Sequence, residues 1–383
     1  MPASGAAATA RRARAAEADR PIVFALVGAG GAAGVHAAAL SRIAHSRVAA
    51  VLGSSPDSAR ARSLADAYGA RIARDLEALL DDPELDAVVL CTPHPQHAAQ
   101  AIAAAEAGLH VVVEKPMALT TADCTAMIEA AERAGVVLSV ISQRRWYSPV
   151  QRVKAAIDQG KIGVPGLASV EVLGWRSPEY YAMDAWRGTR DGEGGGVLVN
   201  QAVHQLDLAC WFLGPPLEVD GWTTNLNHPE IDVEDTAVAV VRFERGALAT
   251  IVASNSQRPG LLARIHVHGT NGASIGVETD RGSIFVAGVS PPSEPVNDLW
   301  TIPGEEDRLD EWRRADREHL AGVDLSSHHH ELQLRDIVAA IRGRRPPAIT
   351  GAGGRTTVGL MTAIETASRA GGRVRLADPV AES

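Results

Sequence analysis

The sequence contains little cysteine, no long apolar run and no excess of basic residues. Its three cysteines, Cys91, Cys124 and Cys210, are widely spaced and form no C-x-x-C pair, so we expect neither a disulfide framework nor a zinc site. No apolar stretch approaches the roughly 20 residues that span a bilayer, which excludes a membrane protein. A net charge of −9 argues against a phosphate-neutralising basic surface, so we expect no nucleic-acid partner.

The chain is long enough for two soluble domains. The 383 residues, 46% hydrophobic and 22% charged, have the composition of an ordinary globular protein. Residues 1–20 are rich in Ala and Arg and show no pattern that could be buried, so we interpret them as a disordered tail. No apolar segment of the length needed for export follows Arg11 and Arg12, and we expect a cytoplasmic protein.

Residues 21–143 alternate short apolar runs with helical stretches. This alternation is typical of parallel βαβ units joined by right-handed crossovers, and it predicts an N-terminal Rossmann dinucleotide-binding domain. The expected strands are 22–28, 48–53, 86–93, 110–116 and 136–142, and the expected helices are 30–44, 58–69, 75–80, 95–108 and 121–135.

After about residue 142 the order of expected strands and helices changes. Strand-like runs then follow one another with little helix between them, which predicts a large open sheet, mostly antiparallel or mixed, in a C-terminal domain of residues 144–383. The expected strands are 166–175, 235–243, 246–254, 263–269, 273–278 and 282–288, and the expected helices are 150–160, 197–214, 328–343 and 356–371. Residues 290–324 give no readable pattern, and the last helices could pack back on the first domain.

A dinucleotide fingerprint, G-x-G-x-x-A, connects the first expected strand to the first helix. Gly28 permits the tight turn, Gly30 lets the backbone approach a pyrophosphate, and Ala33 is small enough for close packing of the helix. Gly31 and Ala32 lie between them, at a helix N-terminus that attracts an anion. The motif alone is weak, but its place in the first βα unit predicts a nicotinamide cofactor.

The end of the second expected strand favours NADP over NAD. An NAD site needs Asp or Glu there to hold the ribose hydroxyls, whereas this strand ends in Ser54 and Ser55 and the first acid is Asp57. The serines can donate hydrogen bonds to a 2′-phosphate, and Arg60 or Arg62 could reach it from the next helix. The alternative is that these residues only turn the chain, which leaves the protein indifferent between the two cofactors.

Two groups of residues are candidates for catalysis. Lys115, in Glu114-Lys115-Pro116, ends an apolar strand of the first sheet, where it could hydrogen-bond a substrate oxygen beside a nicotinamide; the alternative is a solvated lysine paired with Glu114. Asn200, His204 and Asp207 follow a triple glycine, at spacings of four and three that place them on one helical face. His204 suits proton transfer near neutral pH, although a histidine on an apolar helix is often a core residue.

Taken in order, these motifs resemble those of the Gfo/Idh/MocA family over nearly the whole chain. The combination of Glu114-Lys115-Pro116 with a triple glycine, His204 and Asp207 is the most specific part. The other matching segments are Cys91-Thr92-Pro93 with His97, Gln143-Arg144-Arg145, Trp186-Arg187-Gly188 and Gly194-Gly195-Gly196. The resemblance implies a Rossmann domain followed by a domain built on a large, mostly antiparallel sheet.

The resemblance also implies an activity and a set of site residues. Lys115 and His204 would be catalytic: His204 takes the proton from a ring hydroxyl of a sugar, inositol or other polyol as hydride leaves for the nicotinamide, and Lys115 steadies the oxygen. Many relatives carry Asp where this chain has Asn200, which puts assignment by analogy with inositol dehydrogenases in doubt. Further cofactor contacts are expected at Thr92, Pro93, His97, Glu114, Lys115, Gln143, Trp186 and Arg187. Substrate contacts are expected at Lys115, Arg145, Tyr180, Tyr181, Arg187, Asn200, His204 and Asp207.

Two other functions fit the same fold. An NAD-dependent glycosidase would use transient oxidation, and a non-catalytic NADP-sensing protein would not need to keep Lys115 and His204. A metal site at His328-His329-His330 is not expected, because three consecutive imidazoles on one helix cannot all face one ion; one of them could touch substrate, as in similar family members. The large sheet predicts a homodimer or homotetramer.

Overall fold

The computed structural model describes residues 20–281 and 294–376. The expected tail, apart from Arg20, and the expected strand at 282–288 lie outside these ranges. The chain divides into two compact units: residues 1–143 with 326–355, and residues 144–325 with 356–383. The sequence predicted a domain boundary near residue 143 and left open that the last helices pack back on the first domain; the segment that contains α12 (His328–Gly343) belongs to the first unit.

The first unit is built on a six-stranded parallel sheet with the strand order β3-β2-β1-β4-β5-β6. This order is that of the Rossmann fold, which the sequence predicted. The strands are β1 (Ile22–Val27), β2 (Ser46–Leu52), β3 (Arg71–Ile72), β4 (Ala87–Leu90), β5 (His110–Val113) and β6 (Leu138–Val140). The two-residue strand β3 is too short to show a pattern and was not predicted.

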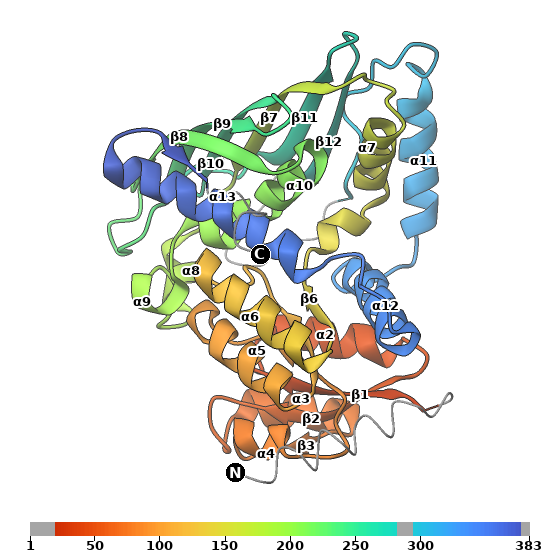
Figure 1. The fold of residues 1–383 in the computed structure, drawn as a ribbon, viewed down its shortest axis with the longest axis vertical. Helices are drawn as coiled ribbons and strands as arrows, with labels where there is room; N and C mark the ends of the chain where they lie inside the picture. The colour runs from red at the N-terminus through yellow and green to blue at the C-terminus, as the bar shows by residue number, and fades with distance from the viewer. Residues whose placement is uncertain (1–19, 282–293, 377–383) are drawn as a thin grey trace. The chain divides into compact units, whose positions relative to one another are not determined.

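Helices of the first unit begin and end at the residues that cap them. Ser58 and Thr120 accept backbone N–H groups at the starts of α3 and α6, and Gly69 and Gly135 end the same helices in the left-handed conformation. The helices are α2 (Gly31–Ser41), α3 (Ala59–Tyr68), α4 (Leu76–Leu80), α5 (His97–Glu106), α6 (Thr121–Ala134) and α12. In Figure 1, α5 lies beside α6.

Helix α12 completes the core of the first unit. Every residue of β1 is buried, and Phe24 and Leu26 share one apolar cluster with Leu334, Ile337 and Ile341 of α12. The side of α12 that faces this cluster also packs against α2. Helix α12, which begins about 300 residues after the glycine-rich loop in the sequence, is therefore part of the unit that carries this loop.

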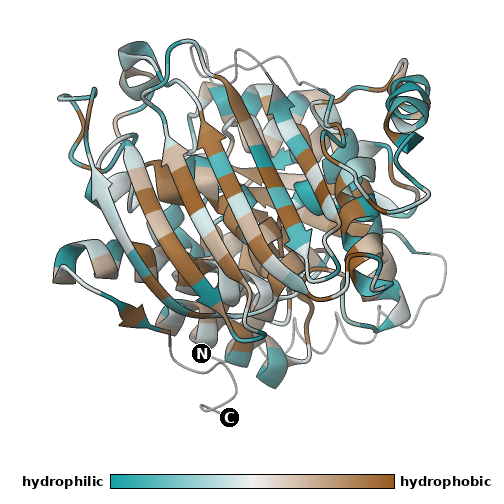
Figure 2. Ribbon diagram, turned by 90° about the horizontal axis from the view of Figure 1, so that it is seen from above, coloured by the Kyte–Doolittle hydropathy of each residue, from teal (hydrophilic) through white to brown (hydrophobic). Residues whose placement is uncertain are grey.

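The second unit is built on a seven-stranded mixed sheet with the order β12-β11-β7-β10-β9-β8-β13. Its strands are antiparallel neighbours except for β7 and β10, which are parallel. They are β7 (Pro165–Leu173), β8 (Pro216–Thr224), β9 (Thr236–Phe243), β10 (Leu248–Ser254), β11 (Leu262–Gly269), β12 (Ser274–Arg281) and β13 (Val374–Arg375). Figure 2 shows apolar and polar residues alternating along several of these strands.

The helices of the second unit include three that the sequence did not reveal: α8 (Pro178–Ala182), α9 (Arg190–Glu193) and α11 (Arg308–Leu320). The others are α7 (Ser148–Asp158), α10 (Val203–Leu213) and α13 (Gly351–Ala370), whose first residues belong to the first unit. A π-helical turn, Leu198–Ala202, precedes α10. No helix in the described ranges is long and apolar enough to cross a membrane.

Candidate active site

The glycine-rich turn lies at the carboxyl end of β1 and leads into α2. Gly28 has a φ of +104°, and a Cβ there would lie 2.5 Å from the carbonyl oxygen of Cys91, so the position requires glycine. Beside Gly30 and Gly31, in contrast, nothing lies within 4 Å of the place a Cβ would take. Ala33 is completely buried, as close packing of the helix requires. An open space at a helix N-terminus fits the pyrophosphate of a dinucleotide.

The residues directly after β2 include no carboxylate before Asp57. Ser54, Ser55 and Arg60 are all exposed. The first acid, Asp57, has a side chain that is 99% exposed and lies 3.6 Å from Arg62. These residues therefore match the polar, acid-free strand end on which the NADP prediction rests.

Lys115 follows β5, on the same sheet edge as the glycine-rich turn. The preceding residue, Glu114, places Oε1 2.7 Å from Nε2 of His36, and its Oε2 accepts the backbone N–H of Lys115 at 3.1 Å. Burial alone would raise the pKa of Glu114, but the hydrogen bond and charge of His36, helped by neighbouring positive charges, lower it to about 2. The sequence predicted that Glu114 contacts the cofactor. In the structure, both of its carboxylate oxygens contact other groups of the protein.

The His97 ring contacts the protein backbone, whereas the sequence predicted that it contacts the cofactor. The ring is completely buried, with Nδ1 3.0 Å from the carbonyl oxygen of Pro116 and Nε2 3.0 Å from that of Thr92. Both ring nitrogens therefore face backbone carbonyl oxygens that follow β4 and β5, and the N–H of the neutral ring donates to one of them. The Thr92 hydroxyl is also engaged, since it donates to Gln100 at 2.6 Å.

Of four further residues expected at the cofactor, two belong to the first unit and two to the second. Gln143, at the end of the first unit, has a buried Oε1 that accepts no hydrogen bond from the described residues, which is consistent with a ligand donor there. Pro93 precedes the short 3₁₀ helix His94–Gln96. In the second unit, the Arg187 guanidinium stacks on Trp186, 4.6 Å from the ring centroid.

The helix that carries His204 does not keep one face through the three expected residues. Asn200 lies in the π-helical turn and Asp207 lies in α10, and the wider turn breaks the α-helical spacing between them. Asn200 contacts α8 and α9, whereas Asp207 is buried against Arg145. Half-buried His204 stands at the second position of α10, between these two environments.

Arg145 and Asp207 bind each other rather than an open cavity. Nε and one terminal nitrogen of Arg145 donate to the two Asp207 oxygens at 2.8 and 2.6 Å, and both side chains are at most 10% exposed. Thr357 also donates to Asp207, at 3.3 Å. The structure thus engages Arg145 and Asp207, two expected substrate contacts, in an internal ion pair, and one Asp207 oxygen accepts from both Arg145 and Thr357.

Tyr180 is the centre of a polar cluster in the second unit. Its hydroxyl accepts hydrogen bonds from Arg187 at 2.5 Å and from Asn200 at 3.1 Å, and Arg187 also lies 4.4 Å from the ring centroid. Asn200 donates to buried Glu193, whose other oxygen accepts the N–H of Gly188 at 2.6 Å. The structure thus brings together three expected substrate contacts, Tyr180, Arg187 and Asn200; the neighbouring Tyr181 packs edge-on against Tyr180 at 5.2 Å.

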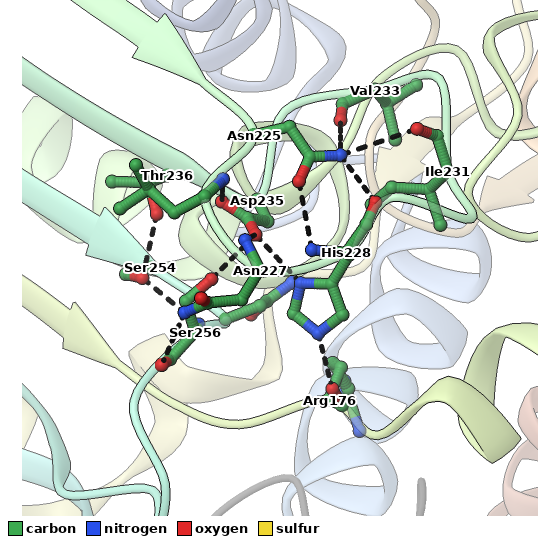
Figure 3. Close-up of polar contacts among 12 residues, drawn as sticks. Arg176, Asn225, Asn227, His228, Ile231, Val233, Asp235, Thr236, Ser254 and Ser256 are labelled. Atoms are coloured by element: carbon green, nitrogen blue, oxygen red, sulfur yellow. Dashed lines mark hydrogen bonds and ion pairs between the residues drawn. The ribbon is translucent and has the colours of Figure 1, made fainter.

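Arg176 stacks on the ring of Tyr180 at 4.1 Å, and a buried network fixes its backbone. His228 lies with Nε2 2.7 Å from the Arg176 carbonyl oxygen and Nδ1 2.8 Å from Asp235 (Figure 3). Asp235 in turn accepts from Ser256 and from two backbone N–H groups. Sequence reasoning missed Arg176, Glu193 and His36, and only His36 gave a signal, as a lone polar residue on an apolar helix.

Family models match both units of the chain. The model for an oxidoreductase family with an NAD-binding Rossmann fold matches residues 22–142, and the model for the GFO/IDH/MocA C-terminal domain matches residues 150–275. The uncharacterised oxidoreductase YrbE of Bacillus subtilis is 32% identical over 67% of this chain and 73% of its own length. The chain belongs to the Gfo/Idh/MocA family.

Relatives within the Gfo/Idh/MocA family include proteins with named activities. The myo-inositol 2-dehydrogenase of Thermotoga maritima is 29% identical over 77% of this chain and 81% of that protein. Among solved structures, the WlbA dehydrogenase of Bordetella pertussis, in complex with NADH and UDP-GlcNAcA, is similar with a TM-score of 0.81 and 31% identity, covering 94% of this chain and 99% of that one. The predictions of the family, the fold class and a nicotinamide-dependent dehydrogenase or reductase are confirmed.

Proposed function

We propose that the chain transfers hydride between NADP and a ring hydroxyl, or the corresponding carbonyl, of a sugar, sugar derivative or inositol. The observation that carries the proposal is the sheet edge of the first unit, where the open glycine-rich turn after β1 and Lys115 after β5 lie in one parallel sheet. The relatives named for inositol, and the 1,5-anhydro-D-fructose reductase of Ensifer adhaerens, support a cyclic polyol as the substrate.

The chain's own residues then have distinct roles. Gly28, Gly30 and the start of α2 would hold the pyrophosphate, and a bound nicotinamide would supply the hydride acceptor or donor. Lys115 donates a hydrogen bond to the reacting oxygen and stabilises negative charge on it, and His204 takes up or returns the hydroxyl proton. Arg187 and Asn200, which both donate to the Tyr180 hydroxyl, supply hydrogen-bond donors for sugar hydroxyls.

The preference for NADP rests on the acid-free end of β2. Ser54 and Ser55 can donate to a 2′-phosphate, and no carboxylate there repels it. The test is a comparison of NADPH and NADH binding by tryptophan fluorescence or calorimetry. NADPH should bind at least about tenfold tighter, and Ser54→Asp should reverse that order by restoring a carboxylate. Tighter binding of NADH by the unmodified chain would contradict the NADP proposal alone.

Turnover is tested by absorbance of the nicotinamide with a panel of sugars and inositols. Lys115→Ala and His204→Asn should each abolish turnover, while Lys161→Ala, which breaks a 2.6 Å ion pair with Glu305 elsewhere, should not. A glycosidase would release an aglycone with no net change of absorbance. A sensor would bind cofactor and turn over nothing, and either result would overturn the proposed reaction.

We also propose that the protein is a homodimer or homotetramer in the cytoplasm. One face of the mixed sheet exposes Leu167, Trp222, Val238, Val240 and Leu248, each between 43% and 64%. Such a face favours burial against a second copy, and Val240→Glu should lower the mass measured by light scattering. The three cysteines are unpaired, in keeping with a reducing compartment.

A further inference from the structure

The His36 ring contacts both the Glu114 carboxylate and the ring of His330, two residues that lie far apart in the sequence. His36, on α2, lies 2.7 Å from Oε1 of Glu114, and His330, on α12, packs edge-on against His36 with ring centroids 5.4 Å apart at 84°. His36 is completely buried and the Glu114 side chain is 13% exposed. The three side chains therefore join the helix of the glycine-rich turn, the end of β5 and helix α12.

The geometry of His36 shows that its contact with Glu114 is specific. Nδ1 of the ring is buried and has no hydrogen-bond partner among the described residues, which is unfavourable by itself. Nε2 faces a carboxylate oxygen, so it is the nitrogen that donates. A buried ring that leaves one nitrogen unsatisfied is held in place by its other contacts, here Glu114 and the ring of His330.

The backbone of Lys115 is fixed from both sides by this arrangement. Its N–H donates to Oε2 of Glu114 at 3.1 Å, and the next carbonyl, that of Pro116, lies 3.0 Å from His97. His36 contacts Oε1 of Glu114 while Oε2 accepts the Lys115 N–H. The position from which the Lys115 side chain extends thus depends on His36, which lies 79 residues earlier in the sequence.

Electrostatic interaction, like the hydrogen bond, links Glu114 to Lys115. The Lys115 ammonium contributes to lowering the pKa of Glu114, so the two groups interact electrostatically, and an ionised Glu114 must favour the charged form of Lys115 in return. Burial, with the charge of His36, lowers the pKa of His330 to about 4, so this ring stays neutral above that pH. The other titratable groups that face Glu114 are Cys91 and His97.

We propose that His36, Glu114 and His330 form a positioning network for Lys115, in which His36 orients the Glu114 carboxylate so that it fixes the Lys115 backbone and keeps its side chain an ammonium. The inference rests on the proposed function only for the use of Lys115 in catalysis. His36 and His330 are positioning residues, since they act through Glu114 and contact no reacting atom.

The composition of the chain allows a direct test without substrate. Its only lysines are Lys115, Lys154 and Lys161, and the last two are paired with Asp158 and Glu305. In protein labelled with carbon-13 at lysine Cε, three resonances can be titrated by NMR. Glu114→Gln, which is nearly isosteric, should lower the pKa of Lys115 by about one unit and leave the other two in place.

Variants of His36 separate positioning from general damage. His36→Gln keeps a donor at similar reach and should leave the pKa of Lys115 close to its original value, whereas His36→Leu should lower it. With NADP and the polyol found in the panel, His36→Leu should reduce kcat about tenfold while the Kd of NADPH stays within about threefold, and His36→Gln should restore most of the rate. Glu106→Gln, at an exposed position of α5, is the matched control.

The outcomes distinguish this inference from the proposed function. If Glu114→Gln leaves the Lys115 pKa within about 0.2 units of its original value, or if His36→Gln is as damaging as His36→Leu, the positioning network is wrong even when Lys115→Ala abolishes turnover. If the Lys115 pKa shifts as expected but no polyol is turned over, the network stands and the proposed reaction fails.

Discussion

Both oxygens of the Asp207 carboxylate are engaged by the Arg145 guanidinium, at 2.6 and 2.8 Å, in a part of the second unit where neither side chain is more than 10% exposed. Arg145 also lies 5.1 Å from the ring centroid of Trp211. This pair lies three residues along α10 from His204, so it fixes the helix that carries the proposed proton acceptor. We therefore expect the pair to have a structural role.

Breaking this pair should destabilise the second unit. Asp207→Leu leaves Arg145 buried without its counter-charge and should cost about 3 kcal/mol, whereas the double variant Asp207→Leu with Arg145→Met should regain most of that loss. Chemical denaturation, with each variant compared by hydrogen exchange on α10, measures the difference. If Asp207→Asn instead raises KM for the polyol without changing stability, the pair contacts substrate as the sequence suggested.

Gly28→Ala should abolish cofactor binding. The added Cβ would lie 2.5 Å from the Cys91 carbonyl oxygen, at a φ of +104°, so the turn must distort. The Kd of NADPH should rise at least about tenfold. The control is Gly34→Ala in α2, where nothing lies within 4 Å of the new atom; this helical substitution should leave binding unchanged and stabilise slightly. Equal binding by both variants would rule out the glycine-rich turn as the cofactor site.

Acid should destabilise the first unit through its buried histidines. Burial lowers the pKa of His110 to about 4, whereas an unfolded histidine titrates near 6.5. The unfolded chain therefore binds the proton first, so the stability contributed by neutral His110 is complete above pH 6.5 and is lost as the pH falls to about 4. His110→Gln retains an acceptor for the Val137 N–H. Its thermal midpoint should fall less between pH 6.5 and 4.5, and an unchanged slope would contradict the assignment.

Glu234 and Glu365 should give the second unit the opposite pH dependence. Burial, together with the charge of Glu365, raises the pKa of Glu234 to about 7, and burial also raises the pKa of Glu365. The folded state then holds a proton that the unfolded state releases, so this contribution to stability decreases as the pH rises from about 4.5 to 7.

Glu365→Gln tests that carboxylate pair. Oε1 of Glu365 is buried, accepts no hydrogen bond from the described residues and lies 3.9 Å from Arg190, so the neutral amide removes a like charge and loses only that long ion pair. At pH 8 the thermal midpoint should rise by about 2–4 °C, and at pH 5 it should change little. Glu218→Gln, whose side chain is 21% exposed, serves as the control. A lower midpoint at pH 8 would show that the charge of Glu365 is stabilising.

The sequence predicted those parts of the fold that have strong apolar periodicity. The βαβ series, the helix at 121–135 and the mixed sheet all follow from spacing. Helix α11 did not, because Arg308–Leu320 is almost entirely polar and buries little beyond Asp316 and Leu320. Strand β8 was missed because its segment, PLEVDGWTT, contains Pro and Gly and reads as a turn.

The candidate site was predicted only in part for a related reason. Motif spacing located Gly28, Lys115 and His204, since each belongs to a local pattern. The contacts of Glu114 with His36 and of Asp207 with Arg145 join residues 78 and 62 positions apart, and no local pattern encodes them. The π-helical turn at Leu198–Ala202 is equally invisible, because it changes the phase of a helix without changing its apolar composition.

The place of α12 in the first unit has a consequence for synthesis of the chain. Leu334, Ile337, Val338 and Ile341 belong to the same core as β1, yet they are made about 200 residues after Gln143. At translation rates of about 5–20 residues per second, that interval lasts roughly 10 to 40 s. During this time the nascent Rossmann unit has an uncovered apolar surface beside α2, where a chaperone could bind, and the unit acquires its complete core only after residues 144–325 of the second unit have been synthesised.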